Sequence, residues 1–270
     1  MKKVVLITGA SSGMGREIAL LLAQNAYTVY AAARRLEKMK DLEPLGIRTL
    51  SMDVIDETSM AKGIQQILET ETRIDVLINN AGFGAYGAIE DVSPDDAKYQ
   101  LEVNVFGAMR LTQLVLPLMR KNKFGKIVNI SSIFGKFTMP YGGWYHASKF
   151  AIEALSDTLR NEVKQFGIDV IIIEPGGVKS EWAEIAYNNL VKNSNRSAYK
   201  ATIDKLSNFM KKATAKNANP QVIAKLVLKS IEAKKPKLRY IGGYMAKPAL
   251  IARKLLPDKW FDKIMVSLIK

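Results

Sequence analysis

The sequence predicts an α/β protein built as one doubly wound parallel sheet with helices on both faces. Three observations predict this fold class. Short β-branched runs alternate with helical patterns over the first two-thirds of the chain. The first run, residues 3–8, is apolar without interruption from residue 4 to residue 7, as in strands that are buried on both faces. A glycine-rich turn follows this run directly and leads into a helical pattern at residues 16–24.

The other elements follow in alternation, with short connections between them. Further strands are expected at residues 28–33, 48–52, 74–79, 126–131, 169–174 and 237–241. Helices are expected at residues 57–71, 94–121, 144–166 and 220–233. We therefore expect a single domain over residues 1–270.

The last ninety residues have a weaker pattern. The polar stretch from residue 180 to 220 is too long for an ordinary connection, so we interpret it as a partly helical lid over a site. Two short helical patterns follow Pro248 and are separated by Pro257. The second, residues 258–269, places six apolar side chains on one stripe: Trp260, Phe261, Ile264, Met265, Leu268 and Ile269. Residues 181–270 are thus expected to form a substrate lid and a basic C-terminal extension.

Composition excludes several kinds of site. The chain has no cysteine, which excludes disulfides, thiolate metal ligands and cysteine nucleophiles. Its single histidine, His146, excludes a histidine-built metal cluster and a Ser-His-Asp triad, and we expect it to pack or to face solvent. We therefore expect no metal site. Because no apolar run reaches the length of a membrane-spanning helix, we expect a cytoplasmic protein.

The net charge of +14 is concentrated at one end of the chain. Residues 192–270 hold 19 Lys or Arg and only 4 Asp or Glu, a net charge of +15, whereas residues 1–191 are close to neutral. Three interpretations of this region compete: a lid alone, a lid that also makes peripheral contact with an anionic membrane, and a nucleic-acid patch. Anionic acyl-carrier or acyl-CoA substrates would also be attracted by the charge. Charge is the only feature that would favour nucleic acid, so we expect no nucleic-acid partner.

The glycine-rich turn is the predicted nucleotide site. In a turn that ends a strand and opens a helix, backbone amides and the helix N-terminus can meet a pyrophosphate. The alternative is a tight turn rich in small residues. The residues expected to bind are Gly9, Ser11, Ser12, Gly13, Met14 and Gly15.

The end of the second strand indicates which nucleotide binds. A carboxylate at this position would hold the ribose 2′-hydroxyl of NAD, but the chain has no acid there. Arg34 and Arg35 stand where a 2′-phosphate needs charge-assisted hydrogen bonds, and Arg16 is placed to help. The sequence therefore predicts NADP(H).

Tyr145 and Lys149 are the candidate catalytic pair. A four-residue step on a helix places the phenol and the ammonium on the same face. The pKa of a free tyrosine is about 10, and a neighbouring cation favours the phenolate. We therefore expect Lys149 to lower the pKa of Tyr145 toward the range of an acid/base catalyst.

With these motifs the sequence resembles the classical short-chain dehydrogenases/reductases, whose fold is the Rossmann fold. The resemblance covers about residues 1–180, which are therefore expected to form the cofactor-binding and catalytic core of the domain. The remainder is loosely similar to hydroxysteroid- and retinol-dehydrogenase-like members. It depends on residues 8–15 and on the following positions: Asp53, Asn79, Asn80, Ala81, Gly82, Asn104, Ser132, Tyr145, Lys149, Pro175 and Gly176.

The resemblance implies a role for each matching residue. Tyr145 corresponds to the acid/base, Ser132 to the serine that binds the substrate oxygen, with Ser131 as its less favoured neighbour, and Asn104 to the residue that holds a water behind Lys149. Lys149 corresponds to the residue that binds the nicotinamide ribose. The other implied cofactor contacts are Asp53, Val54, Asn80, Ala81, Gly82, Pro175, Gly176, Val178 and Ser180.

We therefore predict an NADP(H)-dependent oxidoreductase that interconverts a carbonyl and a secondary alcohol on a lipophilic small molecule. The alternatives are a 3-oxoacyl-thioester reductase and a non-catalytic regulator that senses NADP(H). The resemblance also implies a homodimer or homotetramer that assembles through the helices at residues 94–121 and 144–166.

Overall fold

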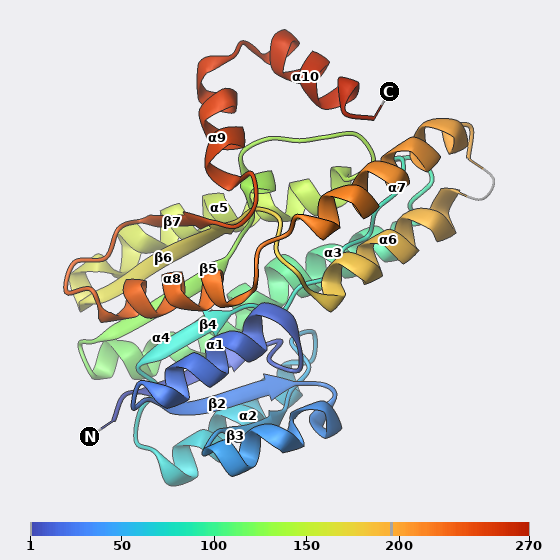
Figure 1. The fold of residues 1–270 in the computed structure, drawn as a ribbon. Helices are drawn as coiled ribbons and strands as arrows, with labels where there is room; N and C mark the ends of the chain where they lie inside the picture. The colour runs from blue at the N-terminus through green and yellow to red at the C-terminus, as the bar shows by residue number, and fades with distance from the viewer. Residues whose placement is uncertain (1, 195–196, 270) are drawn as a thin grey trace.

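The computed structural model describes residues 2–194 and 197–269, and its centre is a seven-stranded parallel sheet (Figure 1). The strands lie in the order β3-β2-β1-β4-β5-β6-β7. Their bounds are β1 (Val4–Thr8), β2 (Thr28–Ala33), β3 (Arg48–Ser51), β4 (Val76–Asn79), β5 (Gly125–Ile130), β6 (Ile168–Pro175) and β7 (Arg239–Gly242). The order reverses between β1 and β4, so the doubly wound Rossmann-type fold predicted from the sequence is confirmed.

The helices divide between the two faces of the sheet. The helices α1 (Gly13–Gln24) and α8 (Gln221–Glu232) pack on one face. The opposite face is covered by α2 (Glu57–Thr70), α4 (Gly107–Lys121) and α5 (Gly143–Val163). A short α3 (Pro94–Leu101) and the 3-10 helices Leu36–Leu45, Ile133–Gly135 and Lys164–Phe166 complete the core.

β1 illustrates why a continuous apolar run forms such a strand. Val5 and Ile7 pack in the core between the sheet and α1 with α8, whereas Val4 and Leu6 pack in the core on the other face. Successive side chains of a strand point to opposite faces, so both sets must be apolar when helices cover both faces.

The helix expected at residues 94–121 is present with these bounds but is not α-helical throughout. A π-helical turn, Glu102–Phe106, separates α3 from α4 and contains Asn104. At its end the backbone of Gly107 comes so close to the loop after β3 that a Cβ would lie 2.3 Å from the carbonyl oxygen of Val54. The predicted bounds of this helical run are therefore confirmed, but the π-helical turn that points Asn104 into the core was not predicted; such turns often occur at functional positions.

The region with the weak pattern is helical. α6 (Glu181–Ser194) and α7 (Lys200–Ala215) pack on each other, and Figure 1 shows them extending beyond the carboxyl ends of the strands. α9 (Ala246–Leu255) and α10 (Asp258–Ser267) follow β7 at the opposite edge of the sheet from β3. No helix in the described residues is long and apolar enough to cross a membrane.

The expectation that the six apolar side chains of residues 258–269 share one stripe was wrong, because they divide between a buried side and an exposed side of the helix. Phe261 and Ile269 are buried at 3% exposure each, but Trp260 is 63% exposed and Ile264 is 41% exposed. Neighbouring residues of a helix project about 100° apart. The row that contains Phe261 therefore faces the body of the protein, and the row that contains Trp260 does not.

Candidate active site

The glycine-rich turn lies between β1 and α1, at the point where the strand order reverses. Gly9 and Gly13 have φ angles of 67° and 54°, a left-handed conformation that favours glycine. The Thr8 hydroxyl accepts hydrogen bonds from the backbone amides of Asn80 and Ala81, each at 3.1 Å. These bonds hold the carboxyl ends of β1 and β4 together and leave the first turn of α1 facing a groove.

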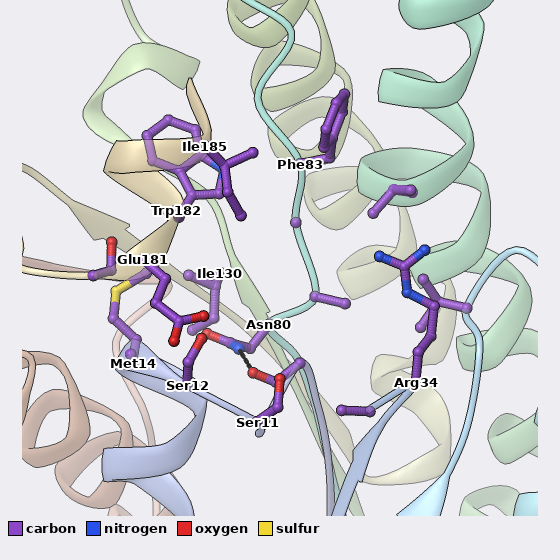
Figure 2. A pocket seen from close by; sticks show the side chains of 18 of the residues that line it. Ser11, Ser12, Met14, Arg34, Asn80, Phe83, Ile130, Glu181, Trp182 and Ile185 are labelled. Carbon is purple, nitrogen blue, oxygen red and sulfur yellow. Dashed lines mark hydrogen bonds between the residues drawn. The ribbon is translucent and has the colours of Figure 1, made fainter. Parts of the chain in front are cut away.

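This groove contains most of the expected cofactor contacts (Figure 2). The predicted residues that line it are Gly9, Ser11, Ser12, Gly13, Met14, Arg34, Arg35, Asp53, Val54, Asn80, Ala81, Gly82, Lys149 and Ser180. Trp182, from the region expected to form a lid, also lines it, as do Phe83, Tyr99, Val103, Glu181 and Ile185, which the sequence did not single out. These residues come from segments that are far apart in the sequence, so no local spacing predicts that they line the groove.

Five predicted contacts lie outside the groove lining: Gly15, Tyr145, Pro175, Gly176 and Val178. A Cβ on Gly15 would lie 2.4 Å from both the Gly9 carbonyl oxygen and Asn80 Nδ2, so Gly15 is needed for packing within the turn. A Cβ on Gly176 would lie 2.4 Å from the Tyr244 carbonyl oxygen. The segment from Pro175 to Val178 therefore packs against the residues after β7, and Val178 itself is buried.

The groove residues fit a dinucleotide. The amides of the turn and the N-terminus of α1 can meet a pyrophosphate, while Asp53 and Val54 lie at one end of the lining and Lys149 at the other. The side-chain oxygen of Asn80 is buried and has no hydrogen-bond partner in the described part of the chain. A buried polar atom that faces such a groove suits a ligand with hydroxyl groups.

The basic residues after β2 are engaged with neighbours. Arg34 Nη1 donates to the Tyr99 hydroxyl at 2.8 Å, and Arg35 Nη2 lies 3.3 Å from Glu181 Oε2. Lys38 Nζ also approaches Glu181, at 3.5 Å. Burial acts to raise the pKa of Glu181, but the bond from Arg35 and the charge of Lys38 lower it overall. The Glu181 carboxylate therefore lies as an anion beside the cations expected to bind a phosphate.

Arg16 is not one of those cations. It forms an ion pair with Asp41 and donates to the Lys38 carbonyl oxygen, so its guanidinium holds the 3-10 helix Leu36–Leu45 against α1. The expectation that it helps at the 2′-phosphate has no support in this geometry.

Tyr145 and Lys149 lie one turn apart on α5 and are both buried. Lys149 Nζ donates to the Ile130 carbonyl oxygen at 2.9 Å and lies 5.7 Å from the centre of the Tyr145 ring. Burial raises the pKa of Tyr145 to about 12, and a hydrogen bond with Ser132 acts in the opposite direction. Burial lowers the pKa of Lys149 to about 8, against the charge of Glu153.

The expected lowering of the Tyr145 pKa by Lys149 was therefore wrong for these groups as they stand. The ammonium is held by a backbone carbonyl and lies beside the ring, while aromatic side chains exclude water from the phenol. Desolvation disfavours the phenolate more than this cation favours it.

Asn104 ties three segments together behind this pair. Its Oδ1 accepts from the Phe83 amide at 2.7 Å, and its Nδ2 donates to the Phe83 carbonyl and the Ser148 hydroxyl, each at 3.0 Å. Ser148 in turn donates to the Tyr145 carbonyl oxygen at 2.7 Å. The π-helical turn thus positions the loop after β4 and the first turns of α5.

The two serines at the end of β5 face different neighbours. Ser132 lies beside Tyr145, and its Oγ accepts from the Phe134 amide at 3.1 Å. Ser131 lines the groove, and its buried hydroxyl has no partner among the described residues. Ser132 is therefore the serine placed to act with the Tyr145 phenol.

An aromatic enclosure surrounds the phenol. The ring centres of Trp182, Tyr86 and Phe134 lie 4.8, 5.6 and 6.4 Å from that of Tyr145. His146 stacks on Phe134 at 4.7 Å, and burial lowers its pKa to about 3, so this imidazole is neutral. The prediction that His146 is a packing residue is confirmed.

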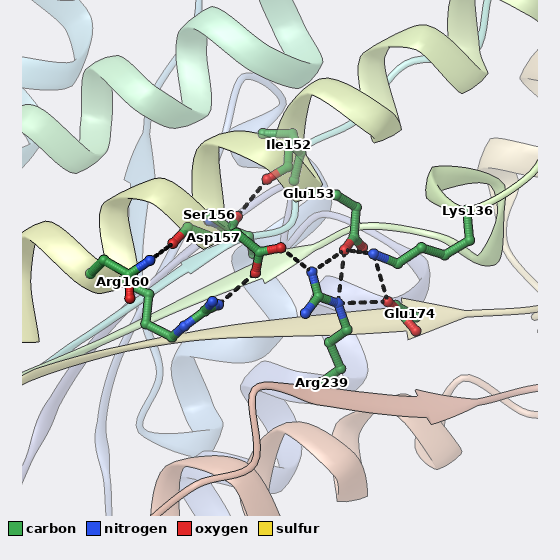
Figure 3. Close-up of polar contacts among 10 residues, drawn as sticks. Lys136, Ile152, Glu153, Ser156, Asp157, Arg160, Glu174 and Arg239 are labelled. Atoms are coloured by element: carbon green, nitrogen blue, oxygen red, sulfur yellow. Dashed lines mark hydrogen bonds and ion pairs between the residues drawn. The ribbon is translucent and has the colours of Figure 1, made fainter.

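A buried ionic network lies behind the site, between α5 and the far strands of the sheet (Figure 3). Lys136 Nζ lies 2.6 Å from Glu153 Oε2 and 3.7 Å from Glu174 Oε1. Arg239 from β7 bridges Glu153, Asp157 and Glu174. In the described part of the chain, no cluster of histidine and carboxylate residues could hold a metal ion.

Comparison with known proteins identifies the same family as the site geometry. The family model described as short chain dehydrogenase matches residues 3–190. A solved short-chain dehydrogenase from Streptomyces avermitilis superimposes with a TM-score of 0.73 at 32% identity, over 89% of this chain and 87% of the other.

Three relatives are similar over nearly their whole length. A probable short-chain type dehydrogenase/reductase VdlC from Helicobacter pylori is 36% identical over 97% of this chain and 96% of its own. A 3-ketodihydrosphingosine reductase from Bacteroides thetaiotaomicron is 35% identical over 95% and 94%. An NADPH-dependent 3-dehydrocapnine reductase from Ornithobacterium rhinotracheale is 33% identical over 99% and 98%.

Proposed function

Because the chain belongs to the short-chain dehydrogenase family, we propose that it is an NADP(H)-dependent oxidoreductase that interconverts a carbonyl and a secondary alcohol on a hydrophobic molecule. The observation that carries the proposal is the clustering of three side chains, one of which lines the groove. Tyr145 lies beside Ser132 outside the groove lining, and Lys149, one turn further along α5, lines the groove itself.

The chemistry follows from where negative charge builds up. In the reductive direction, the bound coenzyme supplies a hydride to the carbonyl carbon. Ser132 and Tyr145 then donate hydrogen bonds to the carbonyl oxygen, and Tyr145 gives up its proton. Because burial keeps its pKa at about 12, the phenol retains that proton at neutral pH until the oxygen becomes basic. The Lys149 ammonium stabilises the phenolate that remains.

The proposal of NADP(H) rests on the end of β2. No carboxylate is present between Ala31 and Arg35, and two guanidiniums line the groove there. The relative from Ornithobacterium rhinotracheale, described as NADPH-dependent, supports the same coenzyme.

The proposal of a lipophilic ketone as substrate rests on the walls around Tyr145. Trp182, Tyr86 and Phe134 enclose the phenol. A second groove beneath α10 is mostly apolar and is lined in part by Met139, Tyr141 and Met265. Two relatives are described as reductases of 3-ketodihydrosphingosine and of 3-dehydrocapnine, which favours ketone reduction over alcohol oxidation.

A substrate screen tests the proposal. We expect NADPH absorbance to fall in the presence of a long-chain, steroid or aromatic ketone, and to fall more slowly with NADH. Preferential turnover of a 3-oxoacyl thioester would favour the alternative reductase. Tight NADPH binding with no turnover across the whole panel would contradict the proposal and favour a coenzyme-sensing regulator.

We also propose that the protein is a homodimer or homotetramer. Three large apolar side chains are exposed on α5 and on the π-helical turn before α4, namely Leu155, Phe150 and Phe106. Apolar side chains of this size on neighbouring helices suit a contact between copies of the chain.

A further inference from the structure

α10 carries a second apolar stripe that faces away from the protein. Phe261, Met265 and Ile269 pack inward, into the cores beneath α9 and α7. Trp260, Ile264 and Leu268 follow the same four-residue spacing one position earlier and are exposed at 63%, 41% and 41%. A helix that only covered a pocket would need one apolar stripe, so the outward stripe requires another explanation.

α9 also exposes large apolar side chains. Ile251 and Leu255, again four residues apart, are 59% and 74% exposed. They precede the Pro257 turn that leads into α10, so the exposed apolar side chains of both helices belong to one continuous segment, residues 246–269. Within the described residues, the exposed apolar side chains Leu255 and Trp260 lie on either side of this turn.

The segment is basic as well as apolar. Residues 246–269 include five cations (Lys247, Arg253, Lys254, Lys259 and Lys263) and two acids (Asp258 and Asp262). Arg253 pairs with Asp258 at 2.7 Å, and Lys263 Nζ lies 5.2 Å from the centre of the exposed Trp260 ring. Flexible lysines beside an exposed indole and aliphatic side chains are typical of helices that lie in a membrane interface.

We propose that the outward stripe of α9 and α10 lies on an anionic lipid surface, with Trp260, Ile264 and Leu255 in the headgroup region and the lysines against lipid phosphates. Charge complementarity favours lipid over a second copy of this chain. A second copy would bring another basic segment of the same sign, and its lysines would repel these.

The position of α10 gives this contact a use, which rests on the proposed function. The other side of the same helix lines the apolar groove beside His146 and Tyr141 with Asp262, Met265 and Val266. His146, which lines this groove, has its ring centre 6.0 Å from that of Tyr145, so a lipophilic ketone drawn from the bilayer to this side of the protein would be close to the phenol.

Vesicle binding by the full chain tests the contact independently of any enzymatic activity. We expect the protein to sediment with phosphatidylcholine vesicles that contain phosphatidylglycerol, to bind less with added salt, and to bind little to phosphatidylcholine alone. Trp260→Ser with Ile264→Ser should abolish binding. Lys259→Gln and Lys263→Gln should each weaken it about fivefold.

Matched controls are available on the opposite part of the molecule. Leu45→Ser removes a 58% exposed leucine, and Lys62→Gln neutralises an exposed lysine on α2. Both should bind vesicles like the unaltered chain. Circular dichroism and NADPH binding establish that each variant is folded. Equal sedimentation of all variants, or none by the unaltered chain, would overturn the proposal.

Tryptophan fluorescence reports which side chain enters the lipid. Anionic vesicles should shift the emission to shorter wavelength in the unaltered chain, whereas Trp260→Phe should still sediment but lose the shift. If sedimentation velocity without lipid shows that Trp260→Ser halves the molecular mass, the stripe is an interface between copies and the lipid proposal is wrong. Loss of vesicle binding with unchanged turnover of a water-soluble ketone would leave the proposed enzymatic function intact.

Discussion

At the scale of single residues, the Tyr145 phenol is both buried among aromatic side chains and a weaker acid than a tyrosine in water. It is enclosed by Trp182 and Tyr86, and burial raises its pKa to about 12. An acid of this strength holds its proton in water-like conditions but can give it to a developing alkoxide, which is a stronger base. The site therefore suits proton donation during carbonyl reduction.

Arg34 provides the test of coenzyme choice. Arg34→Asp should weaken NADPH binding about tenfold to a hundredfold, because a charge-assisted hydrogen bond contributes about 1.5–3 kcal/mol. NADH binding should be unchanged or stronger, since a carboxylate can accept from the ribose 2′-hydroxyl. Titration of both nucleotides by fluorescence measures the ratio, with Lys62→Asp as the control. Equal affinities of the unaltered chain for NADPH and NADH would contradict the assignment.

Glu174 provides a test of the buried ionic network. Burial and the neighbouring Glu153 raise the pKa of Glu174 from 4.5 to about 7, against Lys136 and Arg239. Between about pH 4.5 and pH 7, Glu174 is therefore protonated in the folded state and ionised in the unfolded state. Stability gained from that proton is fully present below about pH 4.5 and is lost as the pH rises through about 7.

The comparison with Glu174→Gln measures this effect. From pH 5 to 8, the free energy of unfolding of the unaltered chain should fall by about 1–3 kcal/mol relative to that variant. Urea unfolding at several pH values measures the difference, and the exposed Glu162→Gln on α5 should show none. A flat difference across the range would mean that Glu174 stays ionised.

Residue-level prediction from the sequence succeeded where the signal was local. The four-residue spacing of Tyr145 and Lys149 predicted that they share one helix face. The glycine-rich turn from Gly9 to Gly13 predicted the position of the groove. The direction of the Tyr145 pKa was not predictable in this way. It depends on Trp182 and Tyr86, which reach the phenol from segments far from it in sequence.

At the scale of secondary-structure elements, α6 is the helix that closes the groove. Its first turn places Trp182 against Tyr145 and Glu181 beside Arg35. Figure 2 shows the Glu181 carboxylate pointing toward Ser12, on the side of the groove where the turn amides lie. Asn189 and Asn193 donate to carbonyl oxygens of Gly84 and Tyr86, each at 2.8 Å, and these bonds hold the rest of the helix down. A phosphate that binds at Arg35 must therefore displace Glu181.

Removal of the Glu181 carboxylate should strengthen binding of the coenzyme. Glu181→Gln should strengthen NADPH binding about twofold to fivefold, because exposed ion pairs contribute about 0.2–1 kcal/mol. The gain for NADH should be smaller, as it has no 2′-phosphate to pair with the released Arg35. Glu184→Gln, exposed on the same helix, serves as the control. Weaker NADPH binding in Glu181→Gln would indicate that the carboxylate contacts the coenzyme instead of competing with it.

The elements themselves were predictable to different degrees. Strands such as residues 28–33 were predicted at their observed bounds, because β-branched and apolar runs are local signals. The π-helical turn at Asn104 was missed, since it depends on the close approach of Gly107 to the loop after β3. α6 and α7 lacked a clear pattern because their buried faces pack on a small aromatic cluster and not on the sheet.

At the scale of the whole molecule, the two regions of the chain differ in charge and in surface. Residues 1–191 build six of the seven strands and the groove lining and are nearly neutral, whereas residues 192–270 add β7 and hold the excess of cations. The sequence located this excess, but only the structure separated the inward stripe of α10 from its outward stripe. The exposed side of α10 carries Trp260 and Ile264, while Met265 on its other side lines an apolar groove.

The proposed assembly predicts a change in molecular mass. Leu155→Asp combined with Phe106→Asp should convert the oligomer to a monomer, because each places a charge in an apolar contact. Sedimentation velocity measures the mass, and Leu45→Asp, on an exposed side chain of a 3-10 helix, is the control. An unaltered chain that is monomeric at micromolar concentration would contradict the proposed assembly.

The central claim is that the Tyr145 hydroxyl transfers the proton while the groove binds the coenzyme. The most direct measurement is NADPH-dependent reduction of an accepted ketone by Tyr145→Phe, made beside a titration of NADPH binding. Loss of that hydroxyl should lower kcat by about a hundredfold to ten-thousandfold, the contribution of a general acid, and should leave NADPH affinity within a few fold. Undiminished turnover by Tyr145→Phe would contradict the account.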